Sequence, residues 1–250
     1  MEINIIILFF TALSGGLLAY KFRRTNKFPF KLTLTFAGAY LFAITVIHVL
    51  PELFMTTTYP ALVGVLVLAG FYMQQILEYF TAGAEHGHMH PLENAHENHD
   101  HHSGTAISLV FALSVHSFLE GTLVGHPTSI PGEDNSFPLL MGIVLHKIPA
   151  AFAMMTILLC HYKNSKLPLF YLIIFALASP LGVLFSGLGV EFGFLTTQSV
   201  DILFALVAGS FLHISTTIVF EGSPGHKFNF SRLAISLLGA LIAIGIEFFH

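Results

Sequence analysis

The chain has 250 residues, of which 54% are apolar and only 10% are charged, and its mean hydropathy is +0.77. Soluble domains carry about 25% charged residues, so this composition argues against a soluble globular protein, and it excludes a disordered or collagen-like chain. The net charge of −4, without a basic patch, argues against a nucleic-acid partner, and the single cysteine, Cys160, excludes a disulfide framework and a Cys-rich zinc module. Fifteen histidines in so apolar a chain indicate instead a membrane protein that handles metal ions or protons.

Eight segments are long and apolar enough to cross a membrane, since a helix that spans ~30 Å of hydrocarbon needs about 20 mainly apolar residues. They are Ile3–Tyr20, Leu32–Phe54, Pro60–Phe80, Thr105–Gly125, Phe137–His161, Leu167–Val190, Val200–Phe220 and Arg232–Phe249. The first is not expected to be a cleavable signal peptide, because its basic cluster follows the apolar run instead of preceding it. The sequence therefore predicts an all-α integral membrane protein, with one eight-helix domain over residues 1–250.

The basic residues predict the orientation of the chain. With eight spans, nine of the ten Lys and Arg residues fall on one side of the membrane: Lys21, Arg23, Arg24, Lys27, Lys31, Lys163, Lys166, Lys227 and Arg232. Cytoplasmic loops carry an excess of Lys and Arg, so this side is expected to be the cytoplasm and both termini are expected outside. We expect a multi-pass protein of the plasma (inner) membrane, in contact with the lipid bilayer.

The longest connection, residues 81–104, is predicted to be a flexible cytoplasmic loop between the third and fourth spans. Its polar composition gives no pattern for a fold. Its imidazoles and carboxylates favour loose, low-affinity binding of Zn²⁺ or similar ions, although a solvated linker that binds nothing is the alternative. The histidines concerned are His86, His88, His90, His96, His99, His101 and His102.

Ionisable side chains also occur inside the spans, where each one costs a few kcal/mol and is a functional candidate by default. His116 and Glu120 are four residues apart, so they share one face of a helix. His146, in the next span, reaches a similar depth in the membrane. Two imidazoles and a carboxylate suit Zn²⁺, Fe²⁺ or Mn²⁺ better than Mg²⁺ or Ca²⁺, so the pattern favours a metal site. A proton relay and a hydrogen-bonded structural pair are the alternatives.

Further polar residues are consistent with a route to and from this site. His48 and Glu52 form a second pair four apart in the outer third of the second span, where an arriving ion could bind first. The seventh span carries His213 and ends near Glu221, which are candidates for release. Ser179 precedes Pro180 in the sixth span, at the depth of the central site. Glu78 and Glu191 lie at helix ends, where carboxylates are ordinary, and we assign them no role.

The run from His116 to Gly121, His-Ser-x-x-Glu-Gly, is followed one span later by His146-Lys147-Ile148-Pro149-Ala150-Ala151-Phe152. Together with the eight spans and the His-rich loop, these motifs resemble the ZIP (Zrt/Irt-like protein) family of divalent-metal transporters. The resemblance implies an importer of Zn²⁺, often also of Fe²⁺ or Mn²⁺, with no prosthetic group. It places the transport site at His116, Ser117, Glu120 and His146. It also implies a homodimer, and a block of the first, fourth, fifth and sixth spans that moves against the other four.

The chain departs from those relatives that bind two ions. Such relatives have carboxylates where this chain has Lys147, Ala150 and Ser179. The ammonium of Lys147 would repel a second cation, so a site for one ion is expected, with Lys147 in the place of the second ion. An unpaired ammonium at this depth is costly, so Lys147 is expected to pair with Glu120; the alternative is that it extends into a water-filled crevice.

Two other functions use the same residues. An intramembrane zinc hydrolase would use His116 and His146 as ligands and Glu120 as the general base, but if Glu120 binds the metal no base is evident. A proton-coupled channel for another solute would use the histidines as proton relays. The hydrolase hypothesis also gives the cytoplasmic histidines no purpose.

Overall fold

The computed structural model describes residues 2–22, 30–81, 102–125, 136–162, 166–221 and 230–249, and every regular element in these ranges is helical. The α-helices are α1 (Glu2–Phe22), α2 (Phe30–Ile44), α3 (Leu50–Thr56), α4 (Pro60–Thr81), α5 (His102–Val124), α6 (Ser136–His161), α7 (Leu167–Glu191), α8 (Thr197–Thr216) and α9 (Phe230–Phe249). Two π-helical turns, η1 (Thr45–Val49) and η3 (Thr217–Glu221), extend α2 and α8.

The number and position of the predicted spans are confirmed. Eight helices are long and apolar enough to cross a membrane, at Glu2–Phe22, Phe30–Thr56, Pro60–Tyr79, Ala106–Val124, Phe137–His161, Leu167–Glu191, Gln198–Val219 and Phe230–Phe249. The second of them consists of α2, η1 and α3. The chain is therefore an all-α, multi-pass membrane protein.

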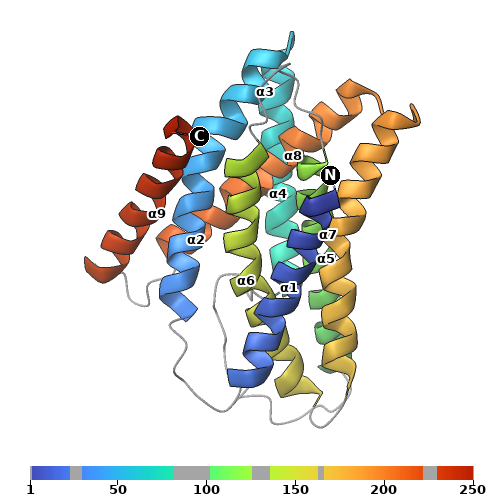
Figure 1. Cartoon of the computed structure of the whole chain (residues 1–250), viewed down its shortest axis with the longest axis vertical. Coiled ribbons are helices and arrows are strands. Elements are labelled where there is room, and N and C mark those ends of the chain that lie inside the picture. Colours follow the sequence, from blue (N-terminus) through green and yellow to red (C-terminus); the bar gives the residue numbers. More distant parts are fainter. Residues whose placement is uncertain are drawn as a thin grey trace.

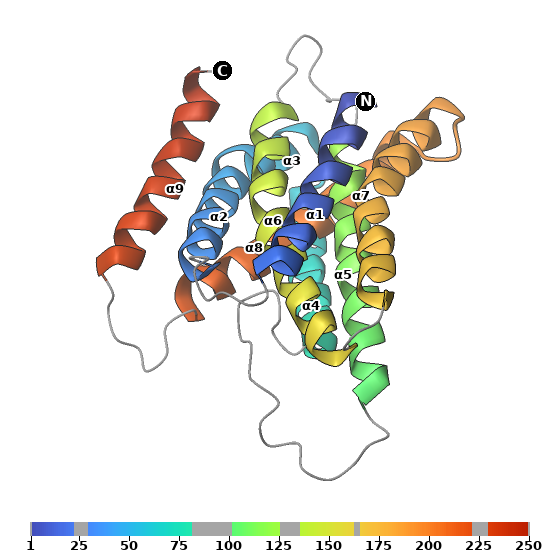
Figure 2. The ribbon, with the colours of Figure 1, turned by 60° about the horizontal axis from the view of Figure 1, so that its bottom comes forward.

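The helices pair in a way that divides the bundle into two groups. The most extensive contacts join α1 to α6, α5 to α7 and α1 to α7 on one side, and α4 to α8 and α2 to α9 on the other. Figures 1 and 2 show α9 at one edge, beside α2, and α7 at the opposite edge. Across the middle, α2 contacts α6, and α5 contacts α4 and α8, so the centre of the bundle is lined by both groups.

Two of these pairs depend on glycine at the contact. A Cβ added at Gly182 of α7 would lie 2.0 Å from the carbonyl oxygen of Phe118, and one at Gly121 of α5 would lie 2.1 Å from that of Ser179. The same applies to α4 and α8, where a Cβ at Gly70 or at Gly209 would lie 1.9 Å from a backbone oxygen of the facing helix. In lipid, such small residues let helices associate through backbone contact. They set the spacing of the helices that carry the central polar residues.

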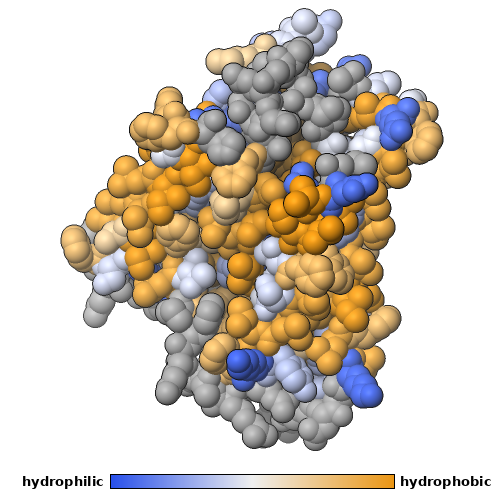
Figure 3. All heavy atoms as spheres, in the orientation of Figure 1, coloured by the Kyte–Doolittle hydropathy of each residue, from blue (hydrophilic) through white to orange (hydrophobic). Residues whose placement is uncertain are grey.

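The surface fits a bilayer. Figure 3 shows apolar side chains covering most of the sides of the bundle on the face drawn, with the hydrophilic residues gathered toward its two ends. The N and C labels lie toward the same end in Figures 1 and 2, as eight spans require. By chain order, Lys21, Lys31, Lys166 and Arg232 lie at helix ends on the opposite side.

Candidate metal centre

The centre of the bundle contains a buried pair on α5. His116 and Glu120 are 3% and 1% exposed, and Nε2 of His116 lies 3.0 Å from Oε1 of Glu120. Their separation of four residues places them on one face of α5, one turn apart, as the sequence indicates. This face is turned toward α6 and α8 and away from lipid.

His146 of α6 completes a group of three. Its Nε2 is 4.0 Å from the same Glu120 oxygen, and its ring stands almost perpendicular to that of His116, with 5.9 Å between the ring centroids. The three ligand atoms all lie within 4.8 Å of one another. Zinc binds imidazole nitrogen and carboxylate oxygen at ~2.1 Å, so two ligands of one ion are at most roughly 4.2 Å apart. A small contraction of these side chains would suit a single divalent ion.

Lys147 occupies the other side of the same carboxylate. Its ammonium donates to Oε2 of Glu120 and to Oγ of Ser117, at 2.6 Å in each case, and it lies 5.5 Å from the centroid of the Phe175 ring. Lys147 is only 1% exposed, so it does not extend into a crevice. The pairing with Glu120 expected from the sequence is therefore present, and each oxygen of Glu120 has its own set of neighbours.

Two serines continue this network toward α7. Oγ of Ser179 donates to the backbone oxygen of Ser117 at 2.6 Å, and the two hydroxyl oxygens are 2.9 Å apart. Because the Ser179 proton is used in the first bond, the Ser117 hydroxyl donates in the second, and it accepts from Lys147. Both serines thus lie on the Lys147 side of Glu120. Ser179, predicted as part of the route, is hydrogen-bonded to the central group through Ser117.

Sequence reasoning missed the partners of the second nitrogen of His116. Nδ1 lies 3.3 Å from Oγ of Ser210 on α8, and Ser210 in turn donates to Oε1 of Gln74 on α4, at 2.8 Å. Ser210 is 94 positions from His116 and 136 positions from Gln74 in the chain, so no local sequence pattern could reveal these contacts. The sequence indicated only that Ser210 and Gln74 are polar residues within apolar helices.

The outer pair contains a further carboxylate that the sequence did not indicate. Nε2 of His48 lies 3.8 Å from Oε2 of Glu52, and its Nδ1 lies 3.0 Å from Oε1 of Glu247 on α9. His48 is part of η1, in which the N–H of Leu50 bonds to the oxygen of Thr45, five residues back. The wider turn comes directly before Pro51, which could not continue a regular helical ladder.

His213 has a close partner on α4. Its Nε2 lies 2.6 Å from Oε2 of Glu78, and its ring stands edge-on to Phe71, 4.8 Å away. Glu78, to which the sequence gave no role, is thus joined to a release candidate. The side chain of Glu221 lies outside the described part of the chain, as do His86, His88, His90, His96, His99, His101 and the side chain of His102.

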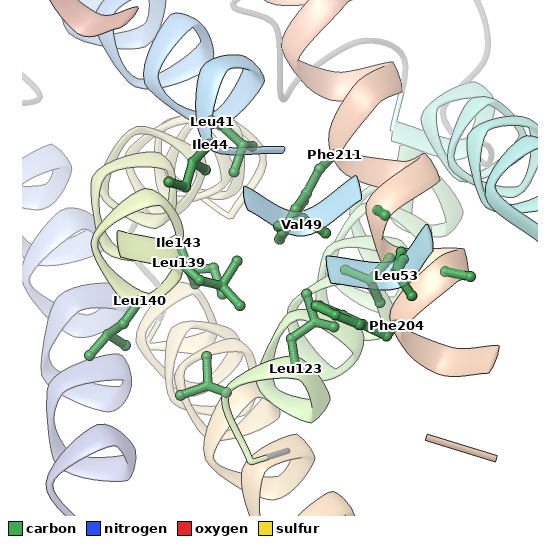
Figure 4. Packing of buried hydrophobic residues seen from close by; sticks show 14 of the residues in the cluster. Leu41, Ile44, Val49, Leu53, Leu123, Leu139, Leu140, Ile143, Phe204 and Phe211 are labelled. Atoms are coloured by element: carbon green, nitrogen blue, oxygen red, sulfur yellow. The ribbon is translucent and has the colours of Figure 1, made fainter. Parts of the chain in front are cut away.

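Apolar side chains fill the space between the central group and the end of the bundle that carries the termini. Leu123 follows Glu120 by three residues on α5, and Ile143 precedes His146 by three residues on α6; both are buried in one cluster. Figure 4 shows part of this cluster, to which α2, η1, α3 and α8 also contribute, with most of the labelled side chains directed into the space between these helices. We call it the apolar cluster. Val49 and Leu53, the neighbours of His48 and Glu52, are part of it.

Comparison with known proteins assigns the chain to a family. The family described as "ZIP Zinc transporter" matches residues 3–247, which is nearly the whole sequence. The chain belongs to the ZIP zinc transporter family. The resemblance seen in the helix motifs is confirmed, and because the family consists of zinc transporters and not enzymes, the hydrolase alternative is not retained.

Individual ZIP relatives differ in how much of the chain they match. The protein zntD of Dictyostelium discoideum is 35% identical over 124 residues, which are 48% of this chain and 18% of that protein. Zinc transporter ZIP9-B of Xenopus laevis is 26% identical over 208 residues, or 76% of this chain and 66% of the relative. Zinc transporter ZIP9 of Micropogonias undulatus is 25% identical over 175 residues, or 67% and 54%. The chain thus spans at most about two thirds of these relatives.

Proposed function

We propose that this protein is a carrier that moves divalent transition-metal ions, Zn²⁺ foremost and Fe²⁺, Mn²⁺ or Cd²⁺ as alternatives, across a membrane into the cytoplasm. Membership of the ZIP family supports metal transport in general. The observation that carries the proposal is the buried group of His116, Glu120 and His146, whose ligand atoms converge in the middle of a membrane bundle. Ionisable groups at this depth are costly and are retained where they serve an ion pathway.

The proposed site binds one ion. His116 and His146 supply nitrogen and Glu120 supplies Oε1, while Lys147 remains bound to Oε2 and fills the position of a second cation. Ser117, which the family motif places at the site, lies on α5 with His116 and Glu120 and accepts a hydrogen bond from Lys147 of α6. Sharing Glu120 between an ion and an ammonium weakens the hold on the ion, which suits a carrier that must release its cargo.

We place the cytoplasm at the end of the bundle away from the termini, because the Lys and Arg residues lie at that end. On this orientation, ions arrive at His48 and Glu52, with Glu247 as a third group, in a plasma or inner membrane. They leave past His213 and Glu78 toward Glu221 and the His-rich loop. The loop histidines bind ions outside the hydrocarbon, so they cannot form the barrier that the ion crosses.

The test is zinc uptake into proteoliposomes that contain a zinc-sensitive dye and the purified full-length protein. His116→Ala, Glu120→Gln and His146→Ala should each reduce initial uptake to near the level of protein-free liposomes while the protein stays folded. His161→Ala is the matched control, since it removes an imidazole from the end of α6, outside the central group, and should leave uptake unchanged. Wild-type uptake by all three site variants would contradict the assignment, and a panel of metals would rank the substrates.

A further inference from the structure

The hydroxyl of Ser210 connects two buried side chains from different parts of the fold. Oγ donates to Oε1 of Gln74 on α4 at 2.8 Å and lies 3.3 Å from Nδ1 of His116 on α5. Gln74 is 0% exposed and Ser210 is 1% exposed. A buried amide is costly unless it is hydrogen-bonded, so the place of Gln74 between two membrane-spanning helices requires an explanation.

The contact depends on the close approach of α4 and α8. Gly70 precedes Gln74 by one helical turn, and Gly209 precedes Ser210 directly; each glycine lies against the backbone of the facing helix. Only at this spacing can the short side chain of Ser210 reach across to α4. The close contact between α4 and α8 therefore holds the Ser210 hydroxyl between Gln74 and His116.

Counting protons fixes the direction of the second contact. A serine hydroxyl has one proton, and that of Ser210 is donated to Gln74. Toward His116 it can then only accept, so this hydrogen bond forms when Nδ1 carries the ring proton. A neutral imidazole protonated at Nδ1 has its lone pair on Nε2, the atom that lies 3.0 Å from Glu120 and belongs to the convergent group with His146.

We infer that Ser210 and Gln74 are positioning residues that hold His116 as the Nδ1-protonated tautomer, so that Nε2 offers its lone pair to the transported cation. The inference rests on the proposed function and adds two residues to it. Groups that hydrogen-bond the far nitrogen of a metal-binding histidine typically change metal affinity by about 10–100-fold. Without Gln74, Ser210 is able to donate to Nδ1 instead, and the ring proton then moves to Nε2, between His116 and Glu120, where it excludes the cation.

Uptake kinetics of the full-length protein in proteoliposomes provide the first test. Ser210→Ala removes the acceptor, and Gln74→Leu keeps Ser210 but frees its proton; each should raise the apparent KM for Zn²⁺ by about 10–100-fold. Ser210→Thr retains the hydroxyl and should stay close to the wild type. Ser186→Ala is the control, because Ser186 is an equally buried serine of α7 that makes no described contact with His116, and its KM should not change.

Nitrogen NMR of the ¹⁵N-histidine-labelled full chain provides a second, spectroscopic test. The His116 signals are identified by their loss in His116→Ala. In the wild type without metal, Nδ1 should carry the proton, and with ¹¹³Cd²⁺ the coupling should appear at Nε2. In Gln74→Leu without metal, the proton should move to Nε2, a change that a purely structural role of Gln74 would not produce.

The outcomes separate this inference from the proposed function. Wild-type KM in both Ser210→Ala and Gln74→Leu would overturn the inference, and so would a raised KM in Gln74→Leu with Nδ1 still protonated. If these two variants behave as wild type while His116→Ala, Glu120→Gln and His146→Ala lose uptake, only the inference fails. If the three site variants also transport normally, the proposed function fails.

Discussion

The two oxygens of Glu120 face different partners. Oε1 points to the imidazoles of His116 and His146, and Oε2 is held by the ammonium of Lys147. The carboxylate therefore keeps a positive neighbour whether or not a metal ion is bound. A buried charge that loses its partner is strongly destabilising, so this pairing stabilises the bundle when no metal ion is bound.

Replacing Lys147 by methionine should show both effects of the ammonium. Glu120 would lose its permanent partner, so the metal-free protein should unfold more easily, by a free energy on the order of 3 kcal/mol. Zinc should then stabilise the variant more than the wild type, and uptake should show a lower apparent KM and a slower turnover. Thermal unfolding with and without zinc, together with uptake kinetics, measures these changes. Lys166→Met, at a helix end, is the control, and an unchanged zinc-induced shift would contradict the shared-carboxylate model.

The absence of carboxylates at Lys147, Ala150 and Ser179 should limit the site to one ion. Lys147→Asp combined with Ala150→Glu would remove the cation and add two carboxylates, so the double variant should bind two ions where the wild type binds one. Ala150 is 4% exposed, so the added side chain must fit inside the bundle. Calorimetry or native mass spectrometry gives the stoichiometry, measured with the loop histidines replaced by serine. Two ions in the central site of otherwise unmodified protein would refute the one-ion model.

Sequence reasoning found the residues that lie on one helix or match a motif. The His116–Glu120 pair follows from helical periodicity, and the charge on Lys147 at this depth indicated that it needed a carboxylate. The residues it missed, such as Gln74 and Glu247, meet their partners across helices that are far apart in the chain. Glu78 was dismissed because it lies near a helix end, but it is paired with His213. Tertiary packing alone brings these groups together.

At the scale of elements, hydropathy predicted each span to within a few residues, because the cost of an unsatisfied backbone in lipid leaves little alternative to a continuous helix. The π-helical turn η1 was not predicted. It depends on local backbone geometry before Pro51, which apolar patterning does not reveal. This turn contains His48, so the position of His48 relative to Glu52 and Glu247 depends on a feature that hydropathy does not reveal.

The contact between α5 and α7 should tolerate no side chain at its glycine positions. Gly182→Ala would place a Cβ 2.0 Å from the backbone oxygen of Phe118, which cannot move without shifting a helix. We expect a loss of about 1–3 kcal/mol in stability, and reduced uptake, because Ser179 and Ser117 would be pushed apart. Gly64→Ala is the matched control, since nothing lies within 4 Å of the added Cβ. Unfolding titrations should separate the two variants; equal stability would contradict the close-contact account.

At the scale of the whole molecule, the central residues come from both groups of helices. His116, Glu120, His146 and Lys147 lie on α5 and α6, whereas Ser210 and Gln74 lie on α8 and α4. A displacement of one group against the other would therefore alter the surroundings of His116 while leaving the Glu120–Lys147 pair intact. The proposed metal ligands therefore belong to one group of helices, and the residues that hydrogen-bond to His116 from behind belong to the other.

The apolar cluster has an electrical consequence. A layer of hydrocarbon side chains has a low dielectric constant and excludes water, so much of the membrane potential should fall across it and little along hydrated paths. A divalent ion that crosses the full potential gains about 4.6 kcal/mol per 100 mV, twice the value for one elementary charge.

Initial uptake should therefore accelerate when valinomycin and a potassium gradient make the liposome interior negative. Faster uptake would show that net positive charge crosses the membrane, as expected for an ion that passes the layer formed by Leu123, Ile143 and their neighbours without a compensating charge. Equal rates with and without this potential would contradict that expectation.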